Sequence, residues 1–284
     1  MKLTALGTGG FFTINNFHTN FLLEEGDESM LIDCGTDIKR SMDALGKDPK
    51  RIKYVYVSHE HGDHAGGLEW LGFYSYFVTK EKVYLSTYKY MHPWRALENS
   101  MCNVTGKSYM ELNDYFFPEF VQDAYKEKDN PAFDAIGGLR FELAKTKHIK
   151  DPECHSYGLI FNTMIGNIWI TSDTMEINQA DEEGFLDDES LWNDTWTKGK
   201  NKDGKIPDYI EAMVKRFQTS DMVFHDCDIQ GITDVHAHYK SLLKLPSIIR
   251  KKIHLVHYSD SFTSVNAVKD GFAGFVKPGD SWEF

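Results

Sequence analysis

Residues 58–67 read Ser-His-Glu-His-Gly-Asp-His-Ala-Gly-Gly and place three histidines and one aspartate in the spacing H-x-H-x-D-H. The apolar run at residues 54–57 comes directly before them and is typical of a buried strand. On a regular strand or helix these four side chains could not all point one way, but on a loop at a strand end they can surround a common centre. Imidazole and carboxylate groups bind Zn²⁺ well and also accept Mn²⁺ or iron. The four candidate metal ligands of this segment are His59, His61, Asp63 and His64.

The composition is that of a globular protein with an acidic balance. The chain has 284 residues, and no stretch approaches the roughly 18 consecutive apolar residues of a membrane span. Its 31 basic and 43 acidic residues give a formal charge of −12, which disfavours long nucleic acid because a polyanion requires positive surface. The four cysteines show no metal-type pairing, and the N-terminal residues lack the apolar run of a signal peptide. We therefore expect a soluble, cytoplasmic protein with neither membrane nor long nucleic acid as a partner.

Strands and helices alternate along the chain, without a Pro/Ser-rich linker or a repeat of fixed period. Strands are expected at residues 2–7, 20–23, 30–32, 54–57, 139–145, 157–161, 167–171, 222–225 and 253–256. Helices are expected after residue 35, at 66–78, at 207–218 and near 242–249. Residues 88–135 carry aromatic clusters and predict a mostly helical insertion, and a polar stretch at 178–206 predicts a second insertion. The pattern predicts a single α/β domain over residues 1–284.

The histidine motif and four further segments resemble the metallo-β-lactamase-fold hydrolases over nearly the whole chain. Residues 6–10 (Leu-Gly-Thr-Gly-Gly) and 31–35 (Leu-Ile-Asp-Cys-Gly) are similar to the early turn and the supporting aspartate of that family. Residues 171–174 (Thr-Ser-Asp-Thr) resemble its bridging-carboxylate segment, and residues 255–259 (Leu-Val-His-Tyr-Ser) its final histidine segment. The resemblance implies a four-layer αββα sandwich, here with a helical insertion.

The same resemblance implies a centre of two divalent metal ions, expected to be Zn²⁺ with Mn²⁺ as an alternative. The implied ligands are His59, His61 and His148 for one ion, Asp63, His64 and His257 for the other, and Asp173 as the bridge. His155 is the rival for the third histidine, but His148 is favoured because it lies at the end of an expected strand. Asp33 is expected to orient a ligand histidine, and His225 to lie buried beside the ligands.

A later pair of segments resembles the RNase Z-like phosphodiesterase branch of the fold. Residues 223–228 (Val-Phe-His-Asp-Cys-Asp) and 234–239 (Asp-Val-His-Ala-His-Tyr) are similar to its paired acidic and histidine segments. In that branch the acidic residue orients a histidine that protonates the departing oxygen, because phosphodiester cleavage expels an alkoxide. The resemblance implies His236 as this acid and Asp226 as its orienting carboxylate. His238 is the competitor, and on an extended segment the two rings would face opposite ways.

Spacing within this branch favours a small substrate. RNase Z carries a Gly- and basic-rich arm for tRNA between the third histidine and the bridging aspartate, whereas only 25 residues separate His148 from Asp173. The Gly/Lys-rich loop at residues 198–205 comes after Asp173 instead. Residues 6–23, 31–35 and 66–70 (Gly-Gly-Leu-Glu-Trp, which continue the histidine motif) resemble the cyclic-nucleotide phosphodiesterases, which include the anti-Pycsar proteins of phages and their bacterial relatives. That implies hydrolysis of 3′,5′-cyclic nucleotides to nucleoside monophosphates by a homodimer, acting as a counter-defence protein in the host cytoplasm if a phage encodes it.

A cyclic nucleotide carries one negative charge, which two metal ions can attract despite the net charge of −12. Aromatic side chains that could stack on its base are Phe73, Tyr74, Tyr76, Phe77, Trp94, Tyr115, Phe116 and Phe117. Two alternatives stay open from the sequence: an RNase Z-type tRNA 3′-processing endonuclease, and another ester or lactone hydrolase of the same fold.

Overall fold

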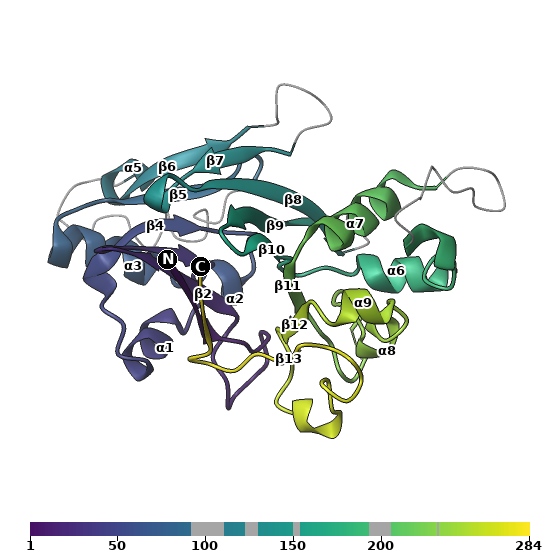
Figure 1. The fold of residues 1–284 in the computed structure, drawn as a ribbon. Helices are drawn as coiled ribbons and strands as arrows, with labels where there is room; N and C mark the ends of the chain where they lie inside the picture. The colour runs from purple at the N-terminus through teal and green to yellow at the C-terminus, as the bar shows by residue number, and fades with distance from the viewer. Residues whose placement is uncertain (92–110, 123–129, 150–153, 193–205, 232) are drawn as a thin grey trace. The chain divides into compact units, whose positions relative to one another are not determined.

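The computed structural model describes residues 1–91, 111–122, 130–149, 154–192, 206–231 and 233–284 (Figure 1). They form two compact units, residues 1–143 with 276–284 and residues 144–275. Each unit contains one set of hydrogen-bonded strands with helices packed on it. Among the described helices, none is both long and apolar enough to cross a membrane.

The first unit is built on a mixed sheet of strand order β14-β1-β2-β3-β4-β5-β6. Its strands are β1 (Lys2–Gly7), β2 (Asn20–Glu25), β3 (Glu28–Ile32), β4 (Ile52–Tyr56), β5 (Val83–Tyr88), β6 (Phe116–Val121) and β14 (Ser281–Glu283). Strands β14, β1, β2 and β3 pair antiparallel, while β3, β4, β5 and β6 pair parallel. Its helices are α1 (Ile38–Ala44), α2 (Gly62–Ala65), α3 (Leu68–Tyr74) and α5 (Leu112–Tyr115), with a π-helical turn at Ser75–Thr79.

Helices α1 and α3 cover one face of this sheet. Their buried side chains, such as Ile38 and Leu68, pack in one cluster with Leu31 of β3 and Val55 of β4. Neighbouring parallel strands end at the same edge of a sheet, so the segments that follow them begin close together. The loop at residues 58–67 follows β4, and the segment at residues 33–35 follows β3. The packing therefore fixes the backbone from which both segments start.

The second sheet has the strand order β13-β12-β11-β10-β9-β8-β7. Strand β7 and the first residues of β8, which pair with each other, belong to the first unit, and the rest of this sheet belongs to the second unit. These strands are β7 (Ala132–Asp134), β8 (Arg140–Ile149), β9 (Cys154–Thr163), β10 (Gly166–Ile170), β11 (Met222–Asp226), β12 (Ile253–Val256) and β13 (Gly274–Phe275). The helices are α6 (Glu176–Glu182), α7 (Asp208–Thr219), α8 (Tyr239–Leu242) and α9 (Ser247–Arg250), which lie along β10–β13 in Figure 1. Strands β10 to β13 run parallel.

The core of the second unit forms where α7 packs on the parallel strands. The helix buries Ile210, Met213, Val214 and Phe217, which recur at helical spacing. The ring of Phe217 meets Trp169 of β10 edge to face, with 5.1 Å between centroids. This packing holds three parallel strands whose carboxyl ends lead into the segments of the predicted bridging aspartate, orienting aspartate and final histidine.

The insertion at residues 88–135 differs from the expectation of a mostly helical segment. In its described part only Leu112–Tyr115 is helical, while β6 and β7 are strands. The run from Phe116 to Val121 is rich in aromatic and β-branched residues and pairs in parallel with β5 as an edge strand, where Pro118 is tolerated. Residues 92–110 and 123–129, which include Trp94, lie outside the described residues.

A second difference concerns the helix expected near residues 242–249. Two short helices, α8 and α9, stand there instead, and Pro246 begins the second of them. Proline has no backbone N–H and clashes with the preceding turn, so it starts a helix more readily than it continues one. The expected strands and the helix that follows Pro207 are confirmed to within a few residues. The Gly/Lys-rich loop at 198–205 lies outside the described residues.

The Phe217→Ala variant is expected to lose about 3–5 kcal/mol of unfolding free energy, because it leaves a cavity beside Trp169. Urea denaturation followed by circular dichroism measures this loss. Met164→Ala, at a side chain that is 91% exposed, is the control and should change stability by less than about 0.5 kcal/mol. Equal stability of the two variants would contradict the core assignment.

Candidate active site

The histidine loop of the first unit brings two imidazole rings together edge to face, with an interplanar angle of 73°. The Nε2 atom of His59 lies 3.1 Å from Nδ1 of His61. The hydroxyl of Ser58 lies 3.1 Å from the other ring nitrogen of His59 and donates its own hydrogen to Asp33. His59 therefore donates from Nδ1 to this hydroxyl, which leaves its Nε2 lone pair directed towards His61. Two ring nitrogens that converge in this way form an arrangement suited to a shared cation.

Asp33 is the buried carboxylate that organises this loop. It accepts hydrogen bonds from the Ser58 amide (2.8 Å) and hydroxyl (3.0 Å), and from Nδ1 of His64 (2.7 Å). Because Nδ1 of His64 is bound to Asp33, its Nε2 atom faces the Asp63 carboxylate, 3.4 Å away. This is the contact expected of an aspartate that orients a ligand histidine.

Two glycines allow the Asp33 segment and the histidine loop to approach each other closely. A Cβ atom on Gly35 would lie 2.1 Å from the carbonyl oxygen of Asp63. A Cβ atom on Gly67 would lie 2.4 Å from the carbonyl oxygen of Gly35. Any side chain at either position would therefore push the segments apart. The amide of Cys34 also donates to the carbonyl of His64 at 2.7 Å, which locks the two backbones together.

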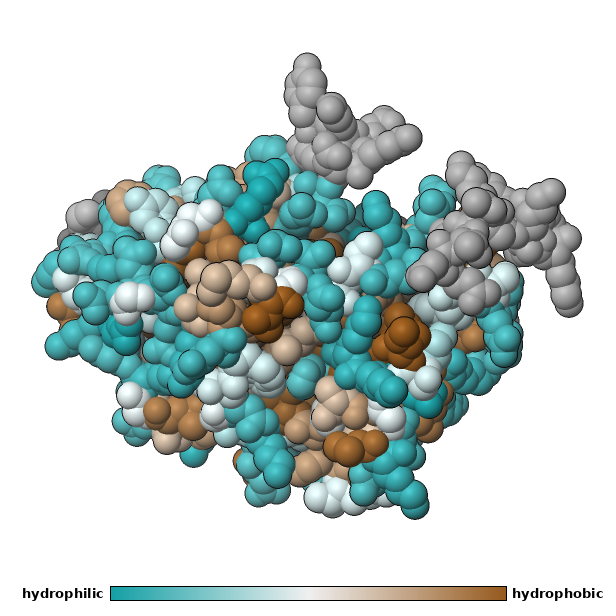
Figure 2. All heavy atoms as spheres, viewed as in Figure 1, coloured by the Kyte–Doolittle hydropathy of each residue, from teal (hydrophilic) through white to brown (hydrophobic). Residues whose placement is uncertain are grey.

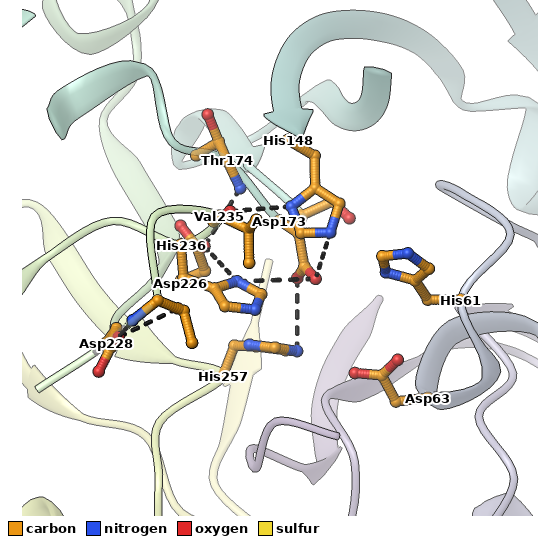
Figure 3. Close-up of polar contacts among 12 residues, drawn as sticks. His61, Asp63, His148, Asp173, Thr174, Asp226, Asp228, Val235, His236 and His257 are labelled. Atoms are coloured by element: carbon orange, nitrogen blue, oxygen red, sulfur yellow. Dashed lines mark hydrogen bonds and ion pairs between the residues drawn. The ribbon is translucent and has the colours of Figure 1, made fainter. Parts of the chain in front are cut away.

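In the second unit three imidazole rings converge on Asp173, as Figure 3 shows. Its carboxylate oxygens lie 3.6 Å from Nε2 of His148, 3.8 Å from Nδ1 of His236 and 3.4 Å from Nε2 of His257. Asp173, His148 and His257 are buried, while the side chain of His236 is 19% exposed. The centre of this cluster is thus shielded from water, and His236 alone of these four reaches the surface.

His148 is oriented by the backbone opposite it. Its Nδ1 atom donates to the carbonyl oxygen of Val235 at 2.9 Å, so its Nε2 atom faces Asp173 (Figure 3). The groups of three or more potential metal ligands found among the described residues include His148 and do not include His155. His148 lies near the end of β8.

Three residues beside these side chains have left-handed backbone conformations. Asp33 (φ 63°) follows β3, Ser172 (φ 56°) follows β10 and His257 (φ 56°) follows β12. Such conformations are uncommon for residues with a Cβ atom and cost free energy, so they persist where the surrounding structure enforces them. Each lies at or next to a candidate site residue, where the turn directs that side chain.

Asp226 at the end of β11 holds the ring of His236. One carboxylate oxygen accepts from Nδ1 of His236 at 3.2 Å and from the amide of Thr174 at 3.1 Å. Burial raises the pKa of Asp226, but hydrogen bonds from His225 and His236 outweigh burial and hold this pKa below its ordinary value. The carboxylate therefore stays ionised at neutral pH and favours the protonated form of the ring that it binds.

His238, the competitor, is used differently in the structure. Its Nε2 atom donates to the carbonyl of Thr233 at 2.7 Å, and its backbone bridges to Asp228. The Asp228 carboxylate in turn accepts the amides of Gly231 and Thr233, each at 3.0 Å. The His238 ring thus closes the loop before it, whereas the ring two residues earlier contacts Asp226.

His225 is buried beside the carboxylate of Asp226. Its Nδ1 atom lies 2.8 Å from the backbone carbonyl and 3.2 Å from a carboxylate oxygen of Asp226. Its ring stacks on Phe217 with an interplanar angle of 5°. It therefore connects the core of the second unit to the carboxylate that holds His236.

Two residues of α6 support the same cluster and are missed by the sequence reasoning. Asn178 donates from its side chain to the carbonyl of His236 and accepts the amide of His238, each at 2.7 Å. Glu176 accepts the amide of Lys147 at 3.2 Å, and burial raises its pKa to about 7 although the nearby Arg216 opposes the shift. Asn178 lies in the polar stretch without a motif and Glu176 just before it, so only the hydrogen bonds reveal their role.

The donor set fits divalent metal ions. Imidazole nitrogens and carboxylate oxygens are the ligands that Zn²⁺ and related ions accept. In the second unit Asp173, Asp226 and His236 each offer a ligand atom within 4.8 Å of the others, close to the surrounding imidazoles. Carboxylates and imidazoles buried this densely are unfavourable without cations or hydrogen-bond donors between them.

Comparisons with known proteins identify the family. The family model described as Anti-Pycsar protein Apyc1 matches residues 1–206 and 203–282. The chain belongs to this family. The Anti-Pycsar protein Apyc1 of Paenibacillus sp. (strain J14) is 28% identical over 266 residues, which cover 93% of this chain and 91% of that protein. The protein of the same name from Bacillus phage vB_BsuM-Goe3 is 25% identical over 268 residues, 92% of this chain and 90% of its own length.

A solved structure confirms the fold class. The metallo-beta-lactamase fold protein YhfI from Bacillus subtilis superimposes with a TM-score of 0.64 and 16% identity, and the match covers 100% of this chain and 99% of that chain. The α/β metallo-β-lactamase fold predicted for this Apyc1 family member is thus confirmed, as is the predicted resemblance to the anti-Pycsar proteins.

Asp33→Asn is expected to weaken metal binding by about 10- to 100-fold, because the amide cannot accept all three hydrogen bonds and His64 loses its orientation. Competition with a chromogenic chelator measures the affinity. Asp134→Asn, at an exposed aspartate of β7, is the matched control and should bind metal as the wild type does. Unchanged affinity in both variants would refute the orienting role of Asp33.

Asn178→Ala is expected to destabilise the protein by about 1–3 kcal/mol, because two buried backbone groups lose their partner. Urea denaturation measures the loss. Asn162→Ala removes a hydrogen bond between exposed side chains and should cost less than about 0.5 kcal/mol. If the two variants were equally stable, Asn178 would not be supporting the segment at residues 236–238.

Proposed function

We propose that the protein is a dinuclear metal-dependent phosphodiesterase that hydrolyses 3′,5′-cyclic nucleotides to nucleoside monophosphates, as a counter-defence protein. The observation that carries this proposal is the contact between His236 and the ionised Asp226 beside Asp173. It provides a proton donor next to a candidate metal-ligand carboxylate, which cleavage of a phosphodiester requires. The anti-Pycsar name shared by bacterial and phage relatives supports the same activity.

The proposed metal ligands follow the order of ligand segments along the chain that the family resemblance implies. They are His59, His61 and His148 for one ion, Asp63, His64 and His257 for the other, and Asp173 as the bridge. The convergence of imidazoles within each unit, and the orientation of His64 and His148 by a hydrogen bond at Nδ1, support this assignment. Zn²⁺ is the expected metal, with Mn²⁺ as the alternative.

Two bound divalent ions would lower the pKa of water and stabilise the negative charge on the phosphoryl oxygens. The protein's own residues would do the remaining work. Because Asp226 binds Nδ1 of His236, the proton for the departing ribose oxygen would be held at Nε2. Asp226 would keep that ring protonated until the oxygen leaves, and the partial exposure of His236 would let substrate reach it.

The substrate class follows from charge. A small monoanionic phosphodiester needs positive charge only at the metal centre, whereas long nucleic acid needs an extended basic surface that a chain of net charge −12 is not expected to offer. We expect a homodimer in the cytoplasm, as the family resemblance implies, and analytical ultracentrifugation would test the oligomeric state.

Protein loaded with Zn²⁺ or Mn²⁺ should linearise cyclic mononucleotides, and chelation should abolish the activity. His236→Gln should lower kcat by about 10²- to 10⁴-fold with unchanged metal content, because only the proton donor is lost. His254→Gln is the matched control, since its ring stacks on Phe224 of β11 and has no proposed role in catalysis. Liquid chromatography of the nucleotide products measures the rates.

Full activity in metal-stripped protein would contradict the proposal. Cleavage of a precursor tRNA at low protein concentration, with cyclic nucleotides left intact, would favour the RNase Z-type alternative. Hydrolysis of carbon esters or lactones with inert phosphodiesters would favour the remaining alternative.

A further inference from the structure

The loop between β1 and β2 presents an exposed aromatic pair. The side chain of Phe11 is 52% exposed and that of Phe12 is 87% exposed. Their rings pack edge to face with 5.1 Å between centroids. The face of the molecule in Figure 2 is mainly hydrophilic, with hydrophobic residues in separate groups. Two adjacent phenylalanine rings exposed to water are unfavourable in free energy, so they indicate a surface that binds a ligand or a partner.

The loop that carries this pair is held rigidly. The amides of Thr8 and Gly9 both donate to the carbonyl of Phe17, at 3.0 and 2.8 Å. The hydroxyl of Thr13 donates to the carbonyl of Gly10, and the side chain of Asn16 donates to the hydroxyl of Thr8, each at 2.8 Å. The exposed rings are therefore displayed by a defined structure, which lowers the entropic cost of binding a flat ligand.

The aromatic pair adjoins the histidine loop within the first unit. The Cε2 atom of Phe11 lies 3.4 Å from the position that a Cβ atom of Gly62 would take. Gly62 stands between two candidate ligands, His61 and Asp63. The ring of Phe11 also lies parallel to that of His18, with centroids 6.2 Å apart. A ligand held at the histidine loop would therefore have the ring of Phe11 beside it, and the ring of Phe12 packs on Phe11.

We propose that Phe11 and Phe12 form the platform that binds the base of the nucleotide, with one ring stacked on the base and the other, nearly perpendicular to it, at the edge of the base. This inference rests on the proposed function and adds the part of the protein that recognises the base. Stacking on an aromatic side chain tolerates every base because each has a π-face. The platform would thus strengthen binding of purine and pyrimidine cyclic nucleotides alike, without a role in the cleavage step.

Four of the aromatic residues expected from the sequence to stack on the base are less suited to this role. Tyr115 and Phe116 are buried in the core of the first unit, and Phe73 packs against Tyr115. Phe117 is 47% exposed but is the second residue of β6, where it pairs with Tyr84 near the start of β5. Because these strands are parallel to β4, that position is at the opposite end from the histidine loop.

The test compares two substrates that differ only in the base: a cyclic nucleotide and the base-free methyl riboside 3′,5′-cyclic phosphate. Phe12→Ala and Phe11→Ala should each raise KM for the cyclic nucleotide by about 5- to 100-fold, with kcat and the KM of the base-free substrate unchanged. Phe12→Trp should restore a low KM. Tyr84→Ala, at an aromatic residue of similar exposure (47%), is the matched control and should leave both KM values unchanged.

Thermal unfolding verifies that each variant is folded. Unchanged KM values for the cyclic nucleotide in folded Phe11 and Phe12 variants would overturn the platform while leaving the proposed function intact. An equal rise in KM for both substrates, with a shift in elution on size exclusion, would overturn it in favour of a contact between subunits. If the wild type cleaves neither substrate, the proposed function fails. The platform is then tested separately by direct titration with the cyclic nucleotide, which compares the affinity of the wild type with that of the Phe11 and Phe12 variants.

Discussion

A carboxylate is stable in a protein interior only when donors or cations surround it, and this requirement shapes the candidate site of both units. Asp33, Asp173 and Asp226 are each buried at or shortly after the end of a strand, and each is approached by at least one imidazole. Each strand must therefore end at a place where hydrogen-bond donors can reach the carboxylate. Left-handed turns, a glycine that permits close approach and buried side-chain hydrogen bonds all serve to bring these groups together.

The parts of the molecule that were predictable from sequence are those in which a local pattern carries the information. The H-x-H-x-D-H spacing and the acidic and histidine residues at strand ends predict most of the imidazole and carboxylate side chains of the candidate site. Asp33 could be assigned as an orienting residue because a supporting aspartate has a fixed place in the family's order of segments. Its bonds to Ser58 and His64 agree with that assignment.

The features that could not be predicted from the sequence depend on contacts between residues far apart in the chain. Asn178 binds backbone groups of residues 236 and 238, and nothing local in its polar stretch distinguishes it from an exposed residue. The choice between His236 and His238 likewise depends on which ring meets Asp226 and which meets a backbone carbonyl. The strand β6 was misjudged because its aromatic residues follow a helical turn, and only pairing with β5 decides its conformation.

The proline in β6 has a consequence for how copies of this chain can associate. A strand on the edge of a sheet can extend it by pairing with a strand of another molecule, which leads to fibres or to sheets that run through a dimer. Pro118 removes a backbone donor from that edge of the first sheet, and the opposite edge, β14, is only three residues long. At both outer strands among the described residues, pairing with a strand of another molecule is therefore less favourable, which favours packed side chains over sheet extension as the means by which the first unit would associate.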